Sequence, residues 1–251
     1  MNLAHNTTKV LITGKSGTGK STYFHKYVLS SFYEIHDRIL IYDFQGESCL
    51  RLNKSPALSV EHLAEQFQQG FVLFDPSEMF PGDIYAGWDF FCEWTFERQQ
   101  INGGTCLLCC DELQVLSSTG QLSHEFSLVI ETGRRYGLDF CGVTQQLNLV
   151  HNRVRNQMTE LVTFQQTDKL ILQALEEKGF DPSEVSRLPK GNFILMNFQT
   201  GAEQRGNVFT GKLTTPKKLD APNNVRQDLQ KRQDPVDSEQ GESPAESADA
   251  P

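Results

Sequence analysis

The chain alternates short apolar runs with stretches whose apolar residues recur at helical spacing. The apolar runs that predict strands cover residues 10–13, 39–43, 71–75, 105–110, 138–144, 162–164 and 192–198. The stretches that predict helices cover residues 19–30, 60–69, 88–100, 122–135 and 168–178. Near-continuous apolar strands separated by helices are typical of a mainly parallel sheet that helices bury on both faces. We therefore predict an α/β fold with such a central sheet, and we expect ligands at the carboxyl ends of its strands.

A glycine-rich segment follows the first apolar run and fits the phosphate-loop pattern G-x-x-x-x-G-K-[ST] with no mismatch. Its residues are Gly14, Lys15, Ser16, Gly17, Thr18, Gly19, Lys20 and Ser21, with Thr22 next to them. Glycines let backbone N–H groups turn inward toward phosphate oxygens, and the positive end of the following helix adds to the attraction. In this pattern Lys20 reaches the β- and γ-phosphates and the Ser21 hydroxyl binds Mg²⁺. An ordinary glycine-rich turn is the alternative interpretation.

Three apolar runs end in an aspartate, namely Asp43, Asp75 and Asp111, and each is a candidate for the acidic residue that holds Mg²⁺. Asp111 is favoured because Glu112 follows it directly. One carboxylate of the pair can serve the metal, while the other polarises water for in-line attack on the γ-phosphate. The alternative is a strand end that merely meets solvent.

Two further groups of polar residues flank the strand predicted at 138–144. Gln145 follows it, and a side-chain amide there can touch the γ-phosphate or the attacking water and report the state of the nucleotide. Arg134 and Arg135 end the helix before it. They are either charges that favour a helix C-terminus or an arginine finger that acts on a neighbouring subunit. The residues themselves do not choose between the two arginines, and a surface position remains the alternative for Gln145.

Charge and composition limit the possible partners only weakly. The chain has 251 residues and a net charge of −9, and its length suits one α/β domain. Six acidic and no basic residues follow Gln233, so the rest of the chain carries only −3. A DNA partner is compatible with that value if positive charge is concentrated locally. We predict an ATPase domain over residues 1–212 and a flexible acidic tail over 213–251, whose composition cannot bury enough apolar surface to fold.

No run of about 18 apolar residues is present, so no membrane span is expected. Four of the six cysteines lie in strand-like apolar runs, which is typical of a reducing cytosol: Cys106, Cys109, Cys110 and Cys141. Their spacing within a strand favours core packing over a zinc site. For the aromatic residues between 85 and 96, packing in the core or at a subunit contact is likewise favoured over stacking on bases.

The order of the motifs resembles the HerA/FtsK superfamily of DNA-pumping ATPases. The resemblance extends from Lys9 to Asn197 and rests on five segments: GKSGTGKST, LLCCDE, ETGRRYGLDFCGVTQQ, RVRNQMTELVTFQQTD and LPKGNFILMN. Within that superfamily, the chain is most similar to the genome-packaging ATPases of membrane-containing double-jelly-roll phages and archaeal viruses.

This resemblance implies a RecA-like P-loop NTPase fold of the ASCE division, with ATP and Mg²⁺ as cofactors. It implies Lys20 and Ser21 at the nucleotide and Asp111 at the metal. Glu112 is then the general base and Gln145 the sensor.

The resemblance further implies a pentameric or hexameric ring around double-stranded DNA, with ATP bound between subunits. Arg134 or Arg135 would act on the neighbouring site. We expect an ATP-driven DNA translocase that packages a viral genome, docks on capsid or portal-vertex proteins, and works in the host cytoplasm or the virion.

Three alternatives stay open. A relative that pumps DNA in conjugation or export is the nearest one. A small-molecule phosphotransferase would need an arginine-rich lid, and the chain shows no such cluster. A non-catalytic assembly module would use the nucleotide only to control oligomerisation.

Overall fold

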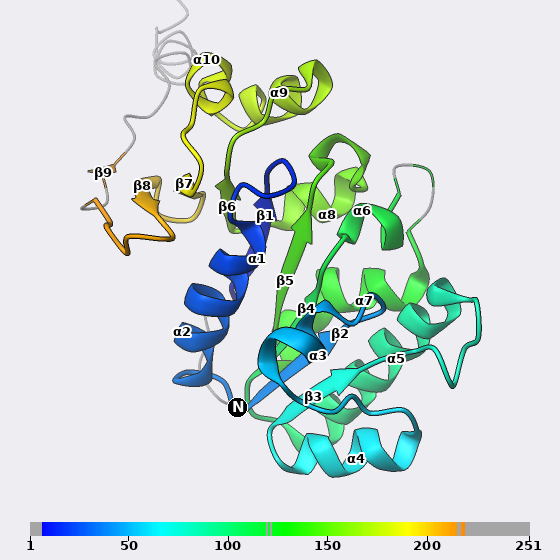
Figure 1. The fold of residues 1–251 in the computed structure, drawn as a ribbon. Coiled ribbons are helices and arrows are strands. Elements are labelled where there is room, and N and C mark those ends of the chain that lie inside the picture. The colour runs from blue at the N-terminus through cyan, green and yellow to red at the C-terminus, as the bar shows by residue number, and fades with distance from the viewer. Residues whose placement is uncertain (1–6, 119, 121, 215–216, 219–251) are drawn as a thin grey trace, which may run out of the picture. The chain divides into compact units, whose positions relative to one another are not determined.

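The computed structural model describes residues 7–118, 120, 122–214 and 217–218, and the predicted acidic tail lies almost entirely outside them (Figure 1). Within the described residues, nine strands form one sheet in the order β3-β2-β4-β5-β1-β6-β7-β8-β9. The strands are β1 (Lys9–Thr13), β2 (Arg38–Tyr42), β3 (Phe71–Phe74), β4 (Cys106–Cys110), β5 (Leu138–Thr144), β6 (Glu160–Thr163), β7 (Asn192–Asn197), β8 (Ala202–Asn207) and β9 (Lys217–Lys218).

The sheet is parallel from β3 to β6 and antiparallel from β6 to β9. The prediction of a mainly parallel sheet is therefore confirmed, and an antiparallel extension is added at one edge. The pattern missed β8 because its sequence, AEQRGN, is polar and all six positions are only half-buried. The sheet also continues past residue 212, where we placed the end of the ATPase domain, because β9 pairs with β8.

Helical segments connect the strands. They are α1 (Lys20–Tyr23), η1 (Phe24–Val28), α2 (Leu29–Tyr33), α3 (Glu47–Leu52), α4 (Val60–Gln68), α5 (Ile84–Asn102), α6 (Leu113–Leu116), α7 (His124–Thr132), η2 (Gly133–Tyr136), η3 (Leu147–Leu149), α8 (Asn152–Gln157), α9 (Lys169–Glu176) and α10 (Pro182–Ser186). The segments α1, η1 and α2 follow one another without a break, and η1 is a π-helical turn. Side-chain oxygens that accept backbone N–H bonds begin α4, α5, α7 and α9: those of Ser59, Asp83, Ser123 and Asp168.

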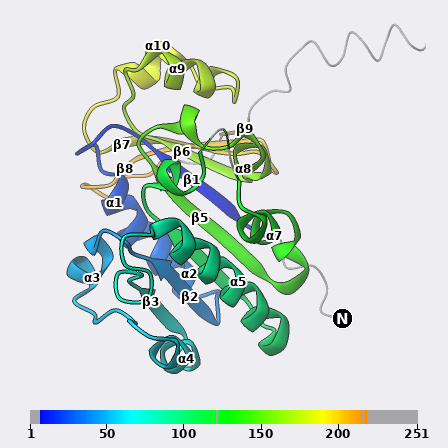
Figure 2. The same cartoon turned by 90° about the vertical axis from the view of Figure 1, so that its right-hand side faces the viewer.

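The two faces of the sheet are covered by different helices (Figure 2). Val10 and Ile12 of β1 face the run α1–η1–α2, with Ile39 and Ile41 of β2 beside them. Leu11 lies on the opposite face, in the cluster that includes α4, α5 and α7. Because successive side chains of a strand point to opposite faces, each apolar run contributes to both cores.

Several predictions about the core are confirmed by burial. Cys106, Cys109, Cys110 and Cys141 are fully buried, and each is a free thiol. The described residues contain no group of histidine, cysteine or acidic side chains arranged to hold a metal ion. Among the aromatic residues of α5, Trp88, Phe91 and Trp94 are buried, while Tyr85 is exposed.

No helix in the described part of the chain is long and apolar enough to cross a bilayer.

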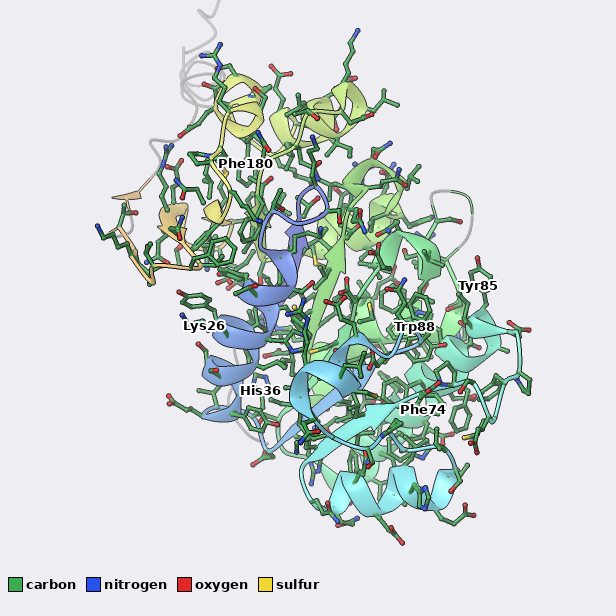
Figure 3. All side chains as sticks on the ribbon, in the orientation of Figure 1. Lys26, His36, Phe74, Tyr85, Trp88 and Phe180 are labelled. Atoms are coloured by element: carbon green, nitrogen blue, oxygen red, sulfur yellow. The ribbon has the colours of Figure 1, made fainter. Side chains whose placement is uncertain are left out.

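Trp88→Ala tests the larger core. The Trp88 ring is 1% exposed and meets the rings of Tyr42 and Phe126 edge-on, with centroids 5.2 and 5.0 Å away (Figure 3). We expect the substitution to lower the free energy of unfolding by about 3–5 kcal/mol in urea denaturation, because it leaves a cavity. Tyr85→Ala, on the same helix but 57% exposed, is the matched control and should cost less than about 0.5 kcal/mol. Equal losses in the two variants would contradict this account of the core.

Candidate active site

The glycine-rich loop connects the carboxyl end of β1 to the start of α1. Within it, the Thr18 hydroxyl donates to the Lys15 carbonyl at 2.7 Å, and the Lys20 ammonium donates to the same carbonyl at 3.1 Å. The Lys15 N–H donates to the Gln165 carbonyl at 3.0 Å, which ties the loop to the segment after β6. Hydrogen bonds within the loop and one to the segment after β6 therefore fix its conformation.

Two glycines of this loop are required by close packing. A Cβ at Gly14 would lie 2.6 Å from the Cβ of Phe164, and one at Gly19 would lie 2.9 Å from Val208. Gly19 also has a φ of +121°, a backbone conformation that side-chain-bearing residues rarely adopt. The pattern therefore specifies the shape of the loop as well as its chemistry.

A cavity of about 330 Å³ opens where the carboxyl ends of β1, β4 and β5 meet. Part of its lining comes from the phosphate loop and its helix: Ser16, Gly17, Gly19, Lys20, Ser21 and Thr22. Asp111, Glu112 and Gln145 line the same cavity. Residues chosen from three separate segments of the sequence are thus brought together, while Gly14, Lys15 and Thr18 shape the loop behind them.

Asp111 is a largely buried carboxylate at the end of β4. One of its oxygens accepts the N–H of Glu112 at 2.7 Å. Burial, reinforced by the charges of Glu112 and Glu47, raises the pKa of Asp111 to about 6 even though that hydrogen bond and Lys20 oppose the shift. Burial also lowers the pKa of Lys20, against the opposing charges of Asp111 and Glu112. A bound ligand that brings an opposite charge close to each group would therefore stabilise the ionised forms of Asp111 and Lys20.

Glu112 is held by two side-chain amides. Gln145 Nε2 donates to one of its carboxylate oxygens and Gln114 Nε2 donates to the other. The backbone of Glu112 has a φ of +49°, in the left-handed region that non-glycine residues seldom occupy. Such strain is common where a side chain is aimed at a functional site.

A chain of hydrogen bonds extends from this carboxylate to the phosphate loop. Gln166 Nε2 donates to the Gln145 carbonyl and to the Thr13 hydroxyl, both at 3.0 Å. Thr13 is the last residue of β1, immediately before the loop. The ends of β1, β4, β5 and β6 are therefore joined by one polar network.

The other two strand-end aspartates serve local structure. The Asp43 carboxylate is buried and accepts the N–H groups of Ser48 and Cys49 at 3.2 and 2.7 Å, within the first turn of α3. Asp75 accepts the N–H of Ser77 at 2.9 Å. Neither lines the cavity, which agrees with the preference for Asp111.

Arg134 and Arg135 lie far from the cavity of their own chain. They belong to η2, which immediately precedes β5, whereas Gln145 immediately follows that strand. A seven-residue strand spans roughly 20 Å, so the arginines lie near the amino end of β5 and the cavity lies at its carboxyl end. Both arginines are exposed. They cannot reach the phosphate loop of their own chain.

Four residues outside the predicted site set also line the cavity: Glu47, Arg51, Lys190 and Phe209. Glu47 and Arg51 form an ion pair of 2.7 Å on α3, a short helix that the sequence pattern does not predict. Lys190 belongs to the LPKG motif, and Phe209 follows the unpredicted strand β8. Gln114 and Gln166 were missed as well. Gln166 comes shortly after a predicted strand, as Gln145 does, so its position after a strand could have identified it as a candidate site residue.

No known protein-family profile matches the chain. No curated protein matches it at a significant level either.

Solved structures share its fold. The genome packaging NTPase B204 from Sulfolobus turreted icosahedral virus 2, in complex with AMPPCP, is 16% identical with a TM-score of 0.62. That match covers 86% of this chain and 100% of the other. The same protein in complex with sulfate gives a TM-score of 0.65 over 86% and 98% of the two chains, again at 16% identity.

VirB4 of Thermoanaerobacter pseudethanolicus is 11% identical with a TM-score of 0.58, over 88% of this chain and 91% of that one. At these identities the likeness concerns the fold. The chain therefore shares the α/β fold of these solved structures, in agreement with the fold class predicted from the sequence.

Proposed function

We propose that this chain is an ATPase that moves double-stranded DNA, most specifically a viral genome-packaging motor that works as a ring. The observation that carries the proposal is the cavity that joins the phosphate loop to Asp111, Glu112 and Gln145. The fold likeness to a genome packaging NTPase in complex with a nucleotide analogue supports it.

The triphosphate would lie in the loop between Gly14 and Lys20. Inward-facing N–H groups and the Lys20 ammonium bind its oxygens, and the start of α1 favours its negative charge. Burial lowers the pKa of Lys20 and raises that of Asp111, which indicates that water solvates both charges poorly. In such surroundings each group interacts more strongly with an opposite charge on a bound ligand than it would in water. The loop residues Ser16, Gly17, Ser21 and Thr22 complete the phosphate site.

Ser21 and Asp111 fit a Mg²⁺ site because both supply oxygen and both line the cavity. Asp111 has a half-buried carboxylate whose negative charge is poorly solvated, and a cation would stabilise it. When bound, Mg²⁺ neutralises charge that develops on the phosphates.

Glu112 is the residue we assign as general base. Its carboxylate would accept a proton from the water that attacks the γ-phosphate. Gln145 and Gln114 each donate to one of its two oxygens. Each oxygen keeps a further lone pair for the attacking water, so the contact between Gln145 and Glu112 would place the sensor beside that water.

Arg134 or Arg135 could act as an arginine finger only on the nucleotide of another subunit. Arg134 and Arg135 are exposed and lie at the sheet edge opposite their own cavity, a placement that suits contact with a neighbour's nucleotide. Hydrolysis would release that contact, and the loops that line the ring would then shift the duplex. Contacts with DNA phosphates are tolerant of sequence and sensitive to salt.

The VirB4 likeness keeps a DNA pump of conjugation or export as a second candidate. ATP turnover with and without duplex DNA, together with the mass of the assembly in solution, tests whether the chain is a DNA-dependent ATPase at all. Stimulation by a nucleoside or sugar in place of DNA would favour a phosphotransferase.

Glu112→Gln tests the assignment of the base. The variant should bind ATP as the wild type does and lose turnover by at least about 100-fold, because the amide cannot accept the proton. Glu93→Gln, an exposed position on α5, is the control and should leave both properties unchanged. Normal turnover by Glu112→Gln would remove Glu112 from the mechanism, and lost turnover with retained packaging would favour the assembly-module alternative.

Asp111→Asn tests the buried carboxylate. Because the pKa of Asp111 is raised to about 6, the folded chain holds this proton more tightly than the unfolded chain. The ionised carboxylate therefore destabilises the nucleotide-free fold above pH 6, and this effect fades as the pH falls toward 4. We expect the substitution to raise Tm by several degrees at pH 7.5 and by clearly less at pH 4.5, measured by thermal unfolding.

The same variant should lose Mg²⁺-dependent ATP binding, whereas Asp75→Asn should keep it. An equal gain in Tm at both pH values would contradict the burial argument. Retained Mg²⁺ dependence would remove Asp111 from the metal site.

Mixing variants tests whether the arginines act between subunits. Arg134→Ala or Arg135→Ala should abolish turnover alone, as should Glu112→Gln. A mixture of an arginine variant with Glu112→Gln should regain part of the activity, because some interfaces then pair an intact Glu112 with an intact finger. An arginine variant that is active alone is not the finger, and a mixture with no recovery would place the arginine's effect within its own subunit.

A further inference from the structure

We infer that Phe209 is the platform on which the base of the bound nucleotide stacks. This inference rests on the proposed nucleotide site and adds the part of the ligand that the phosphate loop does not hold.

The strand order gives the nucleotide a direction. Asp111 and Glu112 follow β4 and Gln145 follows β5, and both strands lie on one side of β1. The γ-phosphate must point to that side for water activated by Glu112 to reach it. A triphosphate is a linear chain, so the ribose and base leave the loop toward the other side of β1, where β6, β7 and β8 lie.

Phe209 stands on that other side and lines the same cavity as the phosphate loop. Its side chain is 53% exposed, so one face of the ring is accessible to a ligand. The ring covers Gly191, where an added Cβ would lie 2.6 Å from Phe209 Cε2. The Gly191 N–H in turn donates to the Thr18 carbonyl at 2.9 Å, so one residue separates the ring from the phosphate loop.

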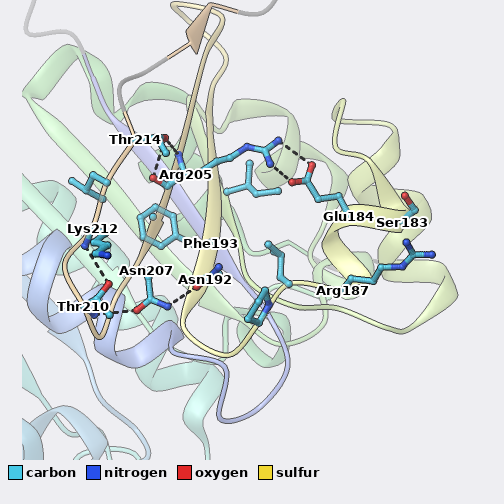
Figure 4. Close-up of a pocket in the computed structure, with 15 residues that line it drawn as sticks. Ser183, Glu184, Arg187, Asn192, Phe193, Arg205, Asn207, Thr210, Lys212 and Thr214 are labelled. Atoms are coloured by element: carbon cyan, nitrogen blue, oxygen red, sulfur yellow. Dashed lines mark hydrogen bonds and ion pairs between the residues drawn. The ribbon is translucent and has the colours of Figure 1, made fainter.

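The turn that carries the ring is fixed by hydrogen bonds. The Asn207 side-chain oxygen accepts the N–H groups of Phe209 and Thr210, each at 3.0 Å. Its amide nitrogen donates to the Asn192 side chain on the neighbouring strand (Figure 4). Val208 is fully buried, and its N–H donates to the Gly191 carbonyl at 2.9 Å. The aromatic face is therefore preorganised before any ligand arrives.

A phenyl ring recognises a base by its face and not by its edge. Stacking on an aromatic side chain stabilises every base to a similar extent, because each has a π-face. Phe209 carries no polar atom that could read the hydrogen-bonding edge of adenine. Its contribution should thus increase affinity for nucleoside triphosphates in general without selecting ATP over GTP.

The test separates the base from the phosphates. Binding of Mg·ATP, Mg·GTP and Mg·tripolyphosphate to the full chain is measured by calorimetry for wild type, Phe209→Ala and Phe209→Trp. Phe198→Ala is the matched control, since Phe198 is 41% exposed after β7 and lies outside the cavity. Sedimentation of each variant reports its assembly state.

We expect Phe209→Ala to weaken both nucleotides by roughly tenfold and to leave tripolyphosphate binding within about twofold. Phe209→Trp should bind nucleotides at least as well as the wild type, and its fluorescence should change with ATP but not with tripolyphosphate. The control should match the wild type for all three ligands.

Equal losses for ATP and tripolyphosphate, or no loss for either, would overturn the inference. A change in assembly mass with unchanged nucleotide affinity would also overturn the inference. It would show that the Phe209 side chain makes a contact between subunits instead. If the wild type binds neither ATP nor tripolyphosphate, the proposed function itself fails. If it binds both but is indifferent to Phe209, only the base platform is lost.

Discussion

The candidate site depends on the parallel pairing of β1 with β5 and of β5 with β4. This pairing brings the ends of three strands, far apart in the sequence, to one edge of the sheet. The register sets Thr13 of β1 beside Thr144 of β5, immediately before the phosphate loop and Gln145. A shift by one residue would turn every core side chain of a strand to the opposite face, so the hydrophobic cores on both sides hold the polar residues in place.

The polar network at this edge gives the site a way to transmit its state. Gln166 joins the end of β1 to Gln145, and Gln145 joins that point to Glu112. The phosphate loop is also tied to Gly191, and through it to the turn after β8. Movement of the loop on nucleotide binding would therefore shift both Glu112, the proposed general base, and the antiparallel part of the sheet.

The sequence was most informative where one physical requirement dominates. Continuous apolar runs predicted each parallel strand, and the glycine pattern predicted the phosphate loop, because burial on two faces and close backbone approach leave few residue choices. The short helix α3 and the strand β8 were missed for the opposite reason. α3 has six residues and is stabilised through a buried Asp43, while β8 is polar and half-buried, so tertiary contacts specify them.

The same limit applies to the site. Asp111 and Gln145 were found because they end apolar strands, whereas Glu47, Arg51 and Phe209 come from those two missed regions. Their place in the cavity follows from the path of the chain in three dimensions. Arg134 and Arg135 show a further limit, since their distance from their own cavity is a property of the fold that their motif does not reveal.

The buried thiols have a practical consequence for labelling the protein. Five cysteines are buried, and burial raises the pKa of Cys49, the half-buried sixth, to about 12. Since only the thiolate is an effective nucleophile, the native chain should resist alkylation and oxidation at neutral pH. One cysteine introduced on the surface would then carry a dye or crosslinker alone, and the native thiols could stay in place during distance measurements.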